Sequence, residues 1–348
     1  MVRRIFILLF SIFLISKAYS DTTRVLFVGN SYTYANDLPS LFTHLSASGN
    51  KIVYTDMNAP GGYMLEQHKT DSTTLSKIRI GNWNYVILQE QSQTPVIDSL
   101  RFNSMYPSAI WLDSLIRSYN GNTAFYMTWG RKYGGQQCIG QFCSPSFVDF
   151  FHMQDSMKVS YKMISDSLNA LLCPVGEAWR KAKLLDSSVD LWQSDLSHPT
   201  LEGSYLAACV FYAAIFNISP VGLSFTGGLS TADALFCQQC AWLAYTGINS
   251  ISNNIPDKFY LEQNYPNPFN AETKIRFKVT SNVKSEMSNV KIFIYDLIGR
   301  KVETLVNSSL QPGIYEVTWN AVNFSTGIYF CTMTAGNFMA ATKLILMK

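Results

Sequence analysis

Charge is scarce in this sequence, and no stretch of it is strongly basic or acidic. Lys and Arg number 27 against 24 Asp and Glu, so the net charge is only +3, and the scattered basic residues argue against nucleic-acid binding. There is also no phosphate-binding loop, no dinucleotide-binding fingerprint and no HxxxH motif, which disfavours nucleotide and zinc chemistry. Apolar residues make up 47% of the chain, which is ample for a buried core.

Long apolar runs are missing after the first 20 residues, so no transmembrane helix is expected there. The N-terminus has a different pattern. Arg3 and Arg4 precede an apolar stretch, Ile5 to Ile15, and Ala18-Tyr19-Ser20 places small residues where a signal peptidase cleaves. We interpret residues 1–20 as a secretory signal peptide. The alternative is a membrane anchor.

Cysteines are few and odd in number, with seven in 348 residues. Export would permit disulfides. Cys138 and Cys143 flank a short loop that a disulfide would close. Cys237 and Cys240 lie one helical turn apart. They are expected either to pair with each other or to leave one of them to pair with Cys209. Two more cysteines stand in apolar segments and are expected to be buried free thiols: Cys173 and Cys331.

Short β-branched or apolar runs alternate with helical patterns over residues 21–252. One such helical pattern places Ala109, Leu112 and Ile116 on a single helix face. Alternation of this kind predicts a parallel sheet with helices on both sides. The expected strands are Arg24–Val28, Lys51–Asp56, Tyr85–Gln89, Thr123–Thr128 and Ala170–Pro174.

The pattern changes near Asn253. Residues 253–270 contain the segment Asn264-Tyr265-Pro266-Asn267-Pro268-Phe269-Asn270, which neither a helix nor an interior strand tolerates. Over residues 271–348 the apolar period becomes two, as in Ile275, Phe277 and Val279. Short strands separated by turn residues predict a small C-terminal β-sandwich.

Several separated motifs of this sandwich resemble the C-terminal sorting domain of type IX secretion. They are the Asn-Pro segment above, Tyr295-Asp296-Leu297-Ile298-Gly299-Arg300, Gly327-Ile328-Tyr329-Phe330 and the end Lys343–Lys348. The resemblance implies that residues 264–348 engage the type IX secretion machinery and that the protein is secreted or displayed at the cell surface, having crossed the periplasm and the outer membrane. An ordinary carbohydrate-binding or adhesive sandwich is the alternative.

A serine and a histidine–aspartate pair stand at the two ends of the α/β region. Ser31 directly follows the apolar run Val25–Val28, and Asp195 precedes His198 by three residues. A serine needs a base to become a nucleophile, and an aspartate can orient that base. The residues therefore predict a Ser-His-Asp acyl-transfer site. Each element also has an alternative interpretation when taken singly. Ser31 could be a helix N-cap, and Asp195 and His198 could belong to a surface turn.

This region resembles the SGNH (GDSL-like) hydrolases, which place the nucleophile after the first strand. The resemblance implies a flavodoxin-like three-layer α/β/α domain with a parallel sheet, and an oxyanion hole built from Ser31 N–H, Gly62 N–H and Gln91. The third member departs from the family pattern, because Gln89-Glu90-Gln91-Ser92 stands where many members have Gly-x-Asn-Asp. The alternative for Gln91 is that it only holds a loop.

Secondary candidates for substrate contact lie near the same edge of the predicted sheet. His68 follows the glycines by about two helical turns, with a half-exposed helix histidine as the alternative. Trp129 and Arg131 follow the fourth strand, and Glu177 follows the fifth.

Together these features predict a secreted serine esterase that uses neither metal nor organic cofactor. An acylated carbohydrate is the substrate expected by family analogy. Two alternatives remain at this point. One is a surface glycan-binding protein without turnover, and the other is an acyltransferase using the same acyl-enzyme.

Overall fold

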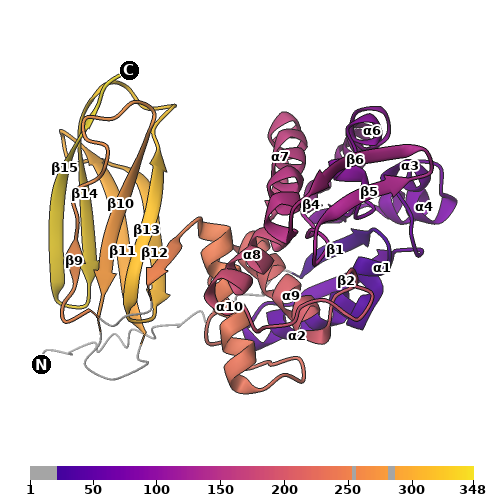
Figure 1. Cartoon of the computed structure of the whole chain (residues 1–348), viewed down its shortest axis with the longest axis horizontal. Helices are drawn as coiled ribbons and strands as arrows, with labels where there is room; N and C mark the ends of the chain where they lie inside the picture. Colours follow the sequence, from indigo (N-terminus) through magenta and orange to yellow (C-terminus); the bar gives the residue numbers. More distant parts are fainter. Residues whose placement is uncertain (1–21, 253–255, 281–286) are drawn as a thin grey trace, which may run out of the picture.

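A computed structural model describes residues 22–252, 256–280 and 287–348 of the chain. It contains an α/β domain followed by a β-sandwich, which Figure 1 shows on the right and left respectively. The proposed signal peptide, residues 1–20, lies outside the described residues. Within the described ranges, no helix combines the length and the apolar character needed to cross a bilayer.

A five-stranded parallel sheet forms the centre of the first domain, in the order β2-β1-β3-β4-β7. The expected parallel sheet is therefore confirmed, with strand ends shifted by one or two residues. Because β1 lies between β2 and β3, the strand order reverses beside it, and ligands of open α/β sheets bind at such a point. The strands are β1 (Thr23–Val28), β2 (Val53–Asn58), β3 (Tyr85–Leu88), β4 (Asn122–Tyr126) and β7 (Leu171–Cys173).

Helices cover both faces of this sheet, so that alternate residues of each strand enter different cores. In β1, Val25 and Phe27 belong to one apolar cluster, and Leu26 and Val28 to the other. This arrangement explains the near-continuous apolar run of the strand. The helices are α1 (Ser31–Tyr34), α2 (Leu38–Ser48), α3 (Leu65–His68), α4 (Ser72–Ile80), α5 (Asp98–Leu100), α6 (Tyr106–Ser118), α7 (Phe150–Leu168), α8 (Val175–Leu185), α9 (Leu201–Phe216) and α10 (Thr231–Thr246).

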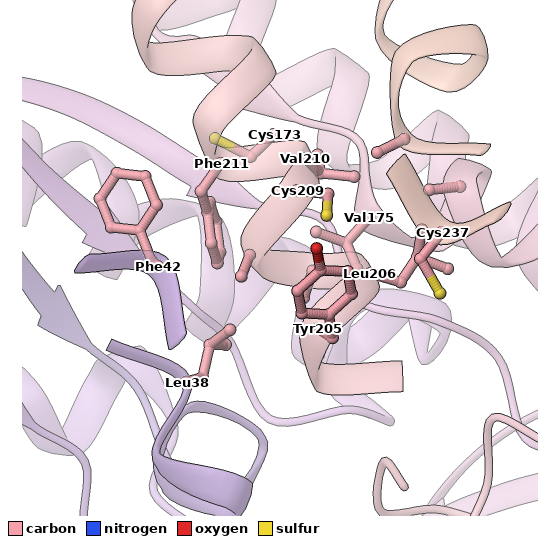
Figure 2. Packing of buried hydrophobic residues seen from close by; sticks show 14 of the residues in the cluster. Leu38, Phe42, Cys173, Val175, Tyr205, Leu206, Cys209, Val210, Phe211 and Cys237 are labelled. Carbon is pink, nitrogen blue, oxygen red and sulfur yellow. The ribbon is translucent and has the colours of Figure 1, made fainter. Parts of the chain in front are cut away.

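Helix α9 is the centre of the larger cluster. Every residue from Gly203 to Ala214 is buried, which matches a helix that is apolar all round. Phe211 of α9 faces Phe42 of α2 (Figure 2). Their ring centroids lie 6.2 Å apart. The helix begins at the Thr200 cap, two residues after His198, so its packing anchors the loop that carries the predicted base.

A hairpin of β5 (Gly135–Ile139) and β6 (Phe142–Phe147) follows β4 and was not among the expected strands. A disulfide between Cys138 and Cys143 closes it, as the loop spacing predicts. The predicted pairings of the α10 cysteines are not formed. All five remaining cysteines are free and buried: Cys173, Cys209, Cys237, Cys240 and Cys331.

The C-terminal part is a sandwich of two four-stranded antiparallel sheets, as predicted. Their orders are β8-β13-β10-β9 and β12-β11-β14-β15. Ile275, Phe277 and Val279 of β10 point into the shared core, which confirms the period-two interpretation. The strands are β8 (Asn249–Ser252), β9 (Tyr260–Leu261), β10 (Glu272–Val279), β11 (Ser288–Asp296), β12 (Lys301–Leu310), β13 (Gly313–Asn320), β14 (Gly327–Ala335) and β15 (Phe338–Leu346).

The two parts join without a long free linker. Strand β8, which the predicted boundary at residue 252 leaves with the first domain, pairs with β13 of the sandwich. Leu243 of α10 and Ile248 are part of the sandwich core. The α/β domain therefore contributes the end of its last helix to the sandwich.

Candidate active site

A pocket of about 350 Å³ opens at the carboxyl edge of the parallel sheet. The segments after β1, β2, β3 and β4 contribute to it, together with the loop before α9. Most of its lining is polar, with side chains from Asn30, Ser31, Tyr32, Tyr34, Gln91, Ser92, Arg131, Ser197 and His198 and the backbone of Gly61 and Gly62.

Ser31, His198 and Asp195 form a continuous hydrogen-bonded row, of which Ser31 and His198 line the pocket. His198 Nε2 lies 2.8 Å from Ser31 Oγ, and His198 Nδ1 contacts Asp195 Oδ2. Burial alone would raise the pKa of Asp195. The hydrogen bonds from the His198 ring and from the backbone N–H groups of His198 and Ser197 outweigh burial and lower this pKa. The ionised carboxylate therefore favours the ring tautomer with Nδ1 protonated and Nε2 free to accept a proton.

The loop that carries Asp195 and His198 is docked onto a buried aromatic stack. Tyr32 OH lies 2.6 Å from Ser197 Oγ, and Trp129 Nε1 donates to the Ser197 carbonyl at 3.0 Å. The rings of Tyr32 and Trp129 stack with centroids 4.6 Å apart, and Trp179 stacks on Trp129 at 3.8 Å. These contacts give the surface turn a fixed position against the nucleophile.

The turn that presents Ser31 is held by its neighbours. Asn30, not Ser31, caps helix α1, because its side chain accepts from Tyr32 N–H. Gln89 pairs reciprocally with Asn30, accepting from its N–H at 2.8 Å and donating to its Oδ1 at 2.9 Å. A Cβ on Gly29 would come within 2.5 Å of Gln89 Oε1, so only glycine allows this close approach.

His68 supports the same turn from beneath and does not line the pocket. Its side chain is buried, with Nε2 2.8 Å from the Gly29 carbonyl and Nδ1 2.8 Å from Thr74 Oγ1. Burial lowers its pKa, which favours the neutral ring that donates from Nε2 and accepts at Nδ1. Neither interpretation of His68, as a substrate contact or as a half-exposed helix residue, agrees with the structure, because both ring nitrogens have partners inside the fold.

The backbone N–H groups of Ser31 and Gly62 are free to bind an oxyanion. Neither donates to an acceptor in the described part of the chain, as is usual for Ser31 at a helix N-terminus. Gly62 has a φ of +75°, a conformation that glycine adopts without strain. Both residues line the pocket.

Gln91 lines the pocket and also holds its own loop. Its Oε1 accepts from Gln93 N–H at 2.7 Å and Thr94 N–H at 3.2 Å. Its Nε2 donates one hydrogen to Gln93 Oε1 at 3.1 Å, which leaves the second for a ligand. Holding the loop and donating a hydrogen bond to an oxyanion are therefore compatible roles for Gln91.

Two secondary candidates lie outside the pocket. Trp129 is 1% exposed and acts as the middle ring of the aromatic stack. Glu177, on α8, is paired with Lys158 at 3.0 Å and Arg180 at 3.3 Å. Neither side chain is part of the pocket lining, since the aromatic stack turns inward and α8 runs away from the sheet edge.

Glu90 connects the segment after β2, which contains Gly62, with the segment after β3, which contains Gln91. It is not among the site residues predicted from the sequence. Its Oε1 accepts from Gln91 N–H at 2.6 Å and from Leu65 N–H at 3.2 Å, and Leu65 is three residues after Gly62. Complete burial raises the pKa of Glu90 to about 8 against these two hydrogen bonds, which lower it. The sequence signal for Glu90 is that it is the one acidic residue in the polar run Gln89–Ser92, directly after a buried strand.

Replacing Glu90 with glutamine should reduce the pH dependence of stability. The unfolded carboxyl titrates near 4.5 and the folded one near 8. The native state therefore holds the extra proton between these values, and wild-type stability falls as pH rises, by up to about 1.4 kcal/mol per pH unit. Urea unfolding from pH 5 to 8 should show a flatter profile for Glu90→Gln. The exposed Glu272→Gln is the control, and parallel profiles for wild type and Glu90→Gln would contradict this account.

Comparison with known proteins identifies the C-terminal region. Residues 263–347 match the family model described as "Secretion system C-terminal sorting domain", which confirms the resemblance of the sandwich. No curated protein matches the chain.

Solved structures also match part of the chain. A DUF4886 family protein from Bacteroides uniformis shares 18% identity with a TM-score of 0.55, covering 64% of this chain and 95% of its own. A proposed SGNH hydrolase from Slackia heliotrinireducens (25%, TM-score 0.45, covering 56% and 100%) and the esterase EstA from Pseudoalteromonas sp. (15%, TM-score 0.40, covering 56% and 97%) also match. The first confirms the α/β fold, and its low identity carries no function over.

Proposed function

We propose that this protein is an exported serine hydrolase that cleaves ester bonds. The observation that carries the proposal is the row from Ser31 Oγ through His198 to Asp195, open to a polar pocket. A serine, a base and an orienting carboxylate at hydrogen-bond distance are the parts required for acyl transfer.

Acylation begins with attack of Ser31 Oγ on the ester carbonyl carbon. His198 Nε2 takes the serine proton, and the ionised Asp195 stabilises the imidazolium. The tetrahedral oxyanion accepts hydrogen bonds from Ser31 N–H, Gly62 N–H and the second Gln91 Nε2 hydrogen. His198 then returns the proton to the leaving alcohol as the carbon–oxygen bond breaks.

Deacylation repeats these steps with water. His198 takes a proton from water, the resulting hydroxide attacks the acyl-enzyme, and Ser31 leaves with the proton from His198. The product is a carboxylic acid. An acyltransferase would use a second alcohol in place of water at this step.

A small acyl group on a polar alcohol suits the pocket best. Its volume of about 350 Å³ favours a short acyl chain over a long one, and the hydroxyl, amide and guanidinium groups in its lining suit a polar alcohol. An acylated carbohydrate, such as an acetyl ester, is the substrate class we propose.

The C-terminal domain supports export as the setting of this activity. Residues 263–347 match a secretion-system sorting domain, and the preceding domain is its proposed cargo. We propose that the type IX machinery recognises residues 264–348 and delivers the enzyme to the cell surface or the medium.

A phosphonate that mimics an ester tests whether Ser31 is an activated nucleophile. We expect one adduct per chain, located on the Ser31 peptide by mass spectrometry. Ser31→Ala should prevent labelling, because no other serine has His198 Nε2 within hydrogen-bond distance in the described residues. Ser40→Ala is the matched control, since Ser40 lies on α2 against His44. An unlabelled wild-type protein would favour a glycan-binding role without turnover.

A further inference from the structure

Arg131 places an unpaired positive charge in the catalytic pocket. It lies in the segment after β4 and lines the pocket beside Ser92 and His198. No Asp or Glu lines this pocket, and none forms an ion pair with Arg131 in the part of the chain that the structure describes. The neighbouring Lys132, in contrast, is paired with Asp190 at 2.9 Å.

Two hydroxyl groups hold the guanidinium in position without neutralising it. Arg131 Nη2 donates to Ser92 Oγ at 3.2 Å, and Nη1 donates to Tyr32 OH at 3.5 Å. Tyr32 and Ser92 are 3% and 6% exposed, so both partners belong to the rigid wall. Since a guanidinium has five N–H donors, several remain for a ligand.

The phenol of Tyr32 is not a hidden anionic partner. Burial raises its pKa, and this effect exceeds the lowering caused by the nearby Arg131 and by the hydrogen bonds with Ser197 and Ser92. Tyr32 is therefore a neutral hydroxyl at physiological pH. Among the described residues, none that lines the pocket pairs a negative charge with Arg131. Asp195, whose charge also acts on Tyr32, is hydrogen-bonded to His198 instead.

We propose that the substrate of this site carries an anionic group, most simply a carboxylate, which Arg131 binds while Ser31 attacks the ester. This inference rests on the proposed hydrolase function and narrows its substrate class from acylated polar alcohols to acylated acids or monoesters of diacids. A guanidinium fork matches a carboxylate geometrically. Ser92 and Tyr32 hold the side chain before the ligand arrives, which lowers the entropic cost of binding.

The anionic group is carried either by the alcohol or by the acyl part of the ester, and matched ester pairs separate the two. For the alcohol side, 4-acetoxybenzoate is compared with the neutral 4-acetoxybenzamide. For the acyl side, the monophenyl ester of adipic acid is compared with the phenyl ester of adipamic acid. Within each pair the reacting ester is the same and only the distant charge differs.

The measured quantity is the ratio of kcat/KM for the anionic ester to that for its neutral partner, with uncatalysed hydrolysis subtracted. We expect Arg131→Gln to lower this ratio about 10- to 100-fold for one pair, the usual range for losing a charge-assisted contact. Arg131→Lys should have an intermediate ratio, because it keeps the charge and loses the fork. Lys132→Gln removes the same charge one residue away, outside the pocket, and should keep the wild-type ratio.

A purely structural role of Arg131 would slow both members of a pair equally and leave the ratio unchanged, which would overturn the proposal. An equal fall in Lys132→Gln would also overturn it, because general electrostatic attraction would then explain the preference. Thermal unfolding of Arg131→Gln shows whether the variant is folded, and Arg131→Lys offers a second reading of the ratio if it is not.

Binding to Ser31→Ala separates this proposal from the proposed hydrolysis. Calorimetric titration with 4-hydroxybenzoate and 4-hydroxybenzamide, and with adipate monoamide and adipamide, needs no turnover. We expect tighter binding of the anion in one pair and loss of that preference in the Ser31→Ala, Arg131→Gln double variant. Anion preference without ester cleavage would refute the hydrolase and keep the anion site. Ester cleavage without anion preference would support the hydrolase and refute the anion site.

Discussion

Replacing Ser31 with alanine is expected to abolish ester hydrolysis and leave the fold intact. The one hydrogen bond of Ser31 Oγ in the described residues is to His198 Nε2, and helix α1 is capped by Asn30. The hydroxyl therefore contributes little to stability. The fall in kcat for 4-nitrophenyl acetate should be about 10⁴- to 10⁶-fold, as when a nucleophile is removed from a serine hydrolase.

Two further variants make this expectation sharper. His198→Ala should cost about as much as Ser31→Ala, and the double variant should cost no more than either, because nucleophile and base act as one unit. Unfolding temperatures of all three should stay within a few degrees of wild type. Removal of a nucleophile should leave far less than about 1% of wild-type activity. Residual activity above that level in Ser31→Ala would exclude Ser31 as the nucleophile.

Asp195→Asn is expected to lower kcat about 10³- to 10⁴-fold with little change in KM. Asparagine can keep the acceptor that Asp195 Oδ1 offers to the N–H groups of Ser197 and His198, at 3.0 and 2.9 Å. The amide nitrogen would then face His198 Nδ1 and donate to it. That contact favours the ring with its hydrogen on Nε2, which cannot accept the Ser31 proton.

The control for this variant is Asp190→Asn. Asp190 lies five residues earlier in the same loop and pairs with Lys132 outside the pocket, so its loss should change kcat only slightly. Steady-state kinetics of both variants on one neutral ester gives kcat and KM separately. Equal effects of the two substitutions would mean that loop stability, and not orientation of His198, explains the loss.

Strand β1 illustrates how much of the fold follows from local sequence. Val25–Val28 is apolar at every position because both faces of the strand are covered, and this run ends three residues before Ser31, where α1 begins. The alternation of Ile275, Phe277 and Val279 likewise identifies a strand with one buried face. Apolar runs and period-two alternation depend on residues that are close in sequence, so they predict strands without knowledge of the tertiary structure.

The cysteines and the secondary site candidates show where that reading ends. Cys237 and Cys240 are one turn apart in sequence, yet each is buried in the core without a sulfur partner. His68, Trp129 and Glu177 lie in the segments that follow β2, β4 and β7, but the packing of their own neighbours turns them away from the pocket. Which way a side chain points is decided by tertiary contacts.

By itself the sequence determined the five strands of the parallel sheet, the change from an α/β pattern to a sandwich, and the identity of the three residues proposed as the triad. These depend on residue chemistry and on periods of two and 3.6 residues. Only the tertiary structure decided that Ser31 and His198, separated by 167 positions, lie 2.8 Å apart. It also decided that Glu90 joins the segments after β2 and β3, and that Arg131 enters the pocket without an ion pair to any described Asp or Glu. Distances, burial and charge compensation are properties of the packed chain, because each depends on residues that are remote in sequence.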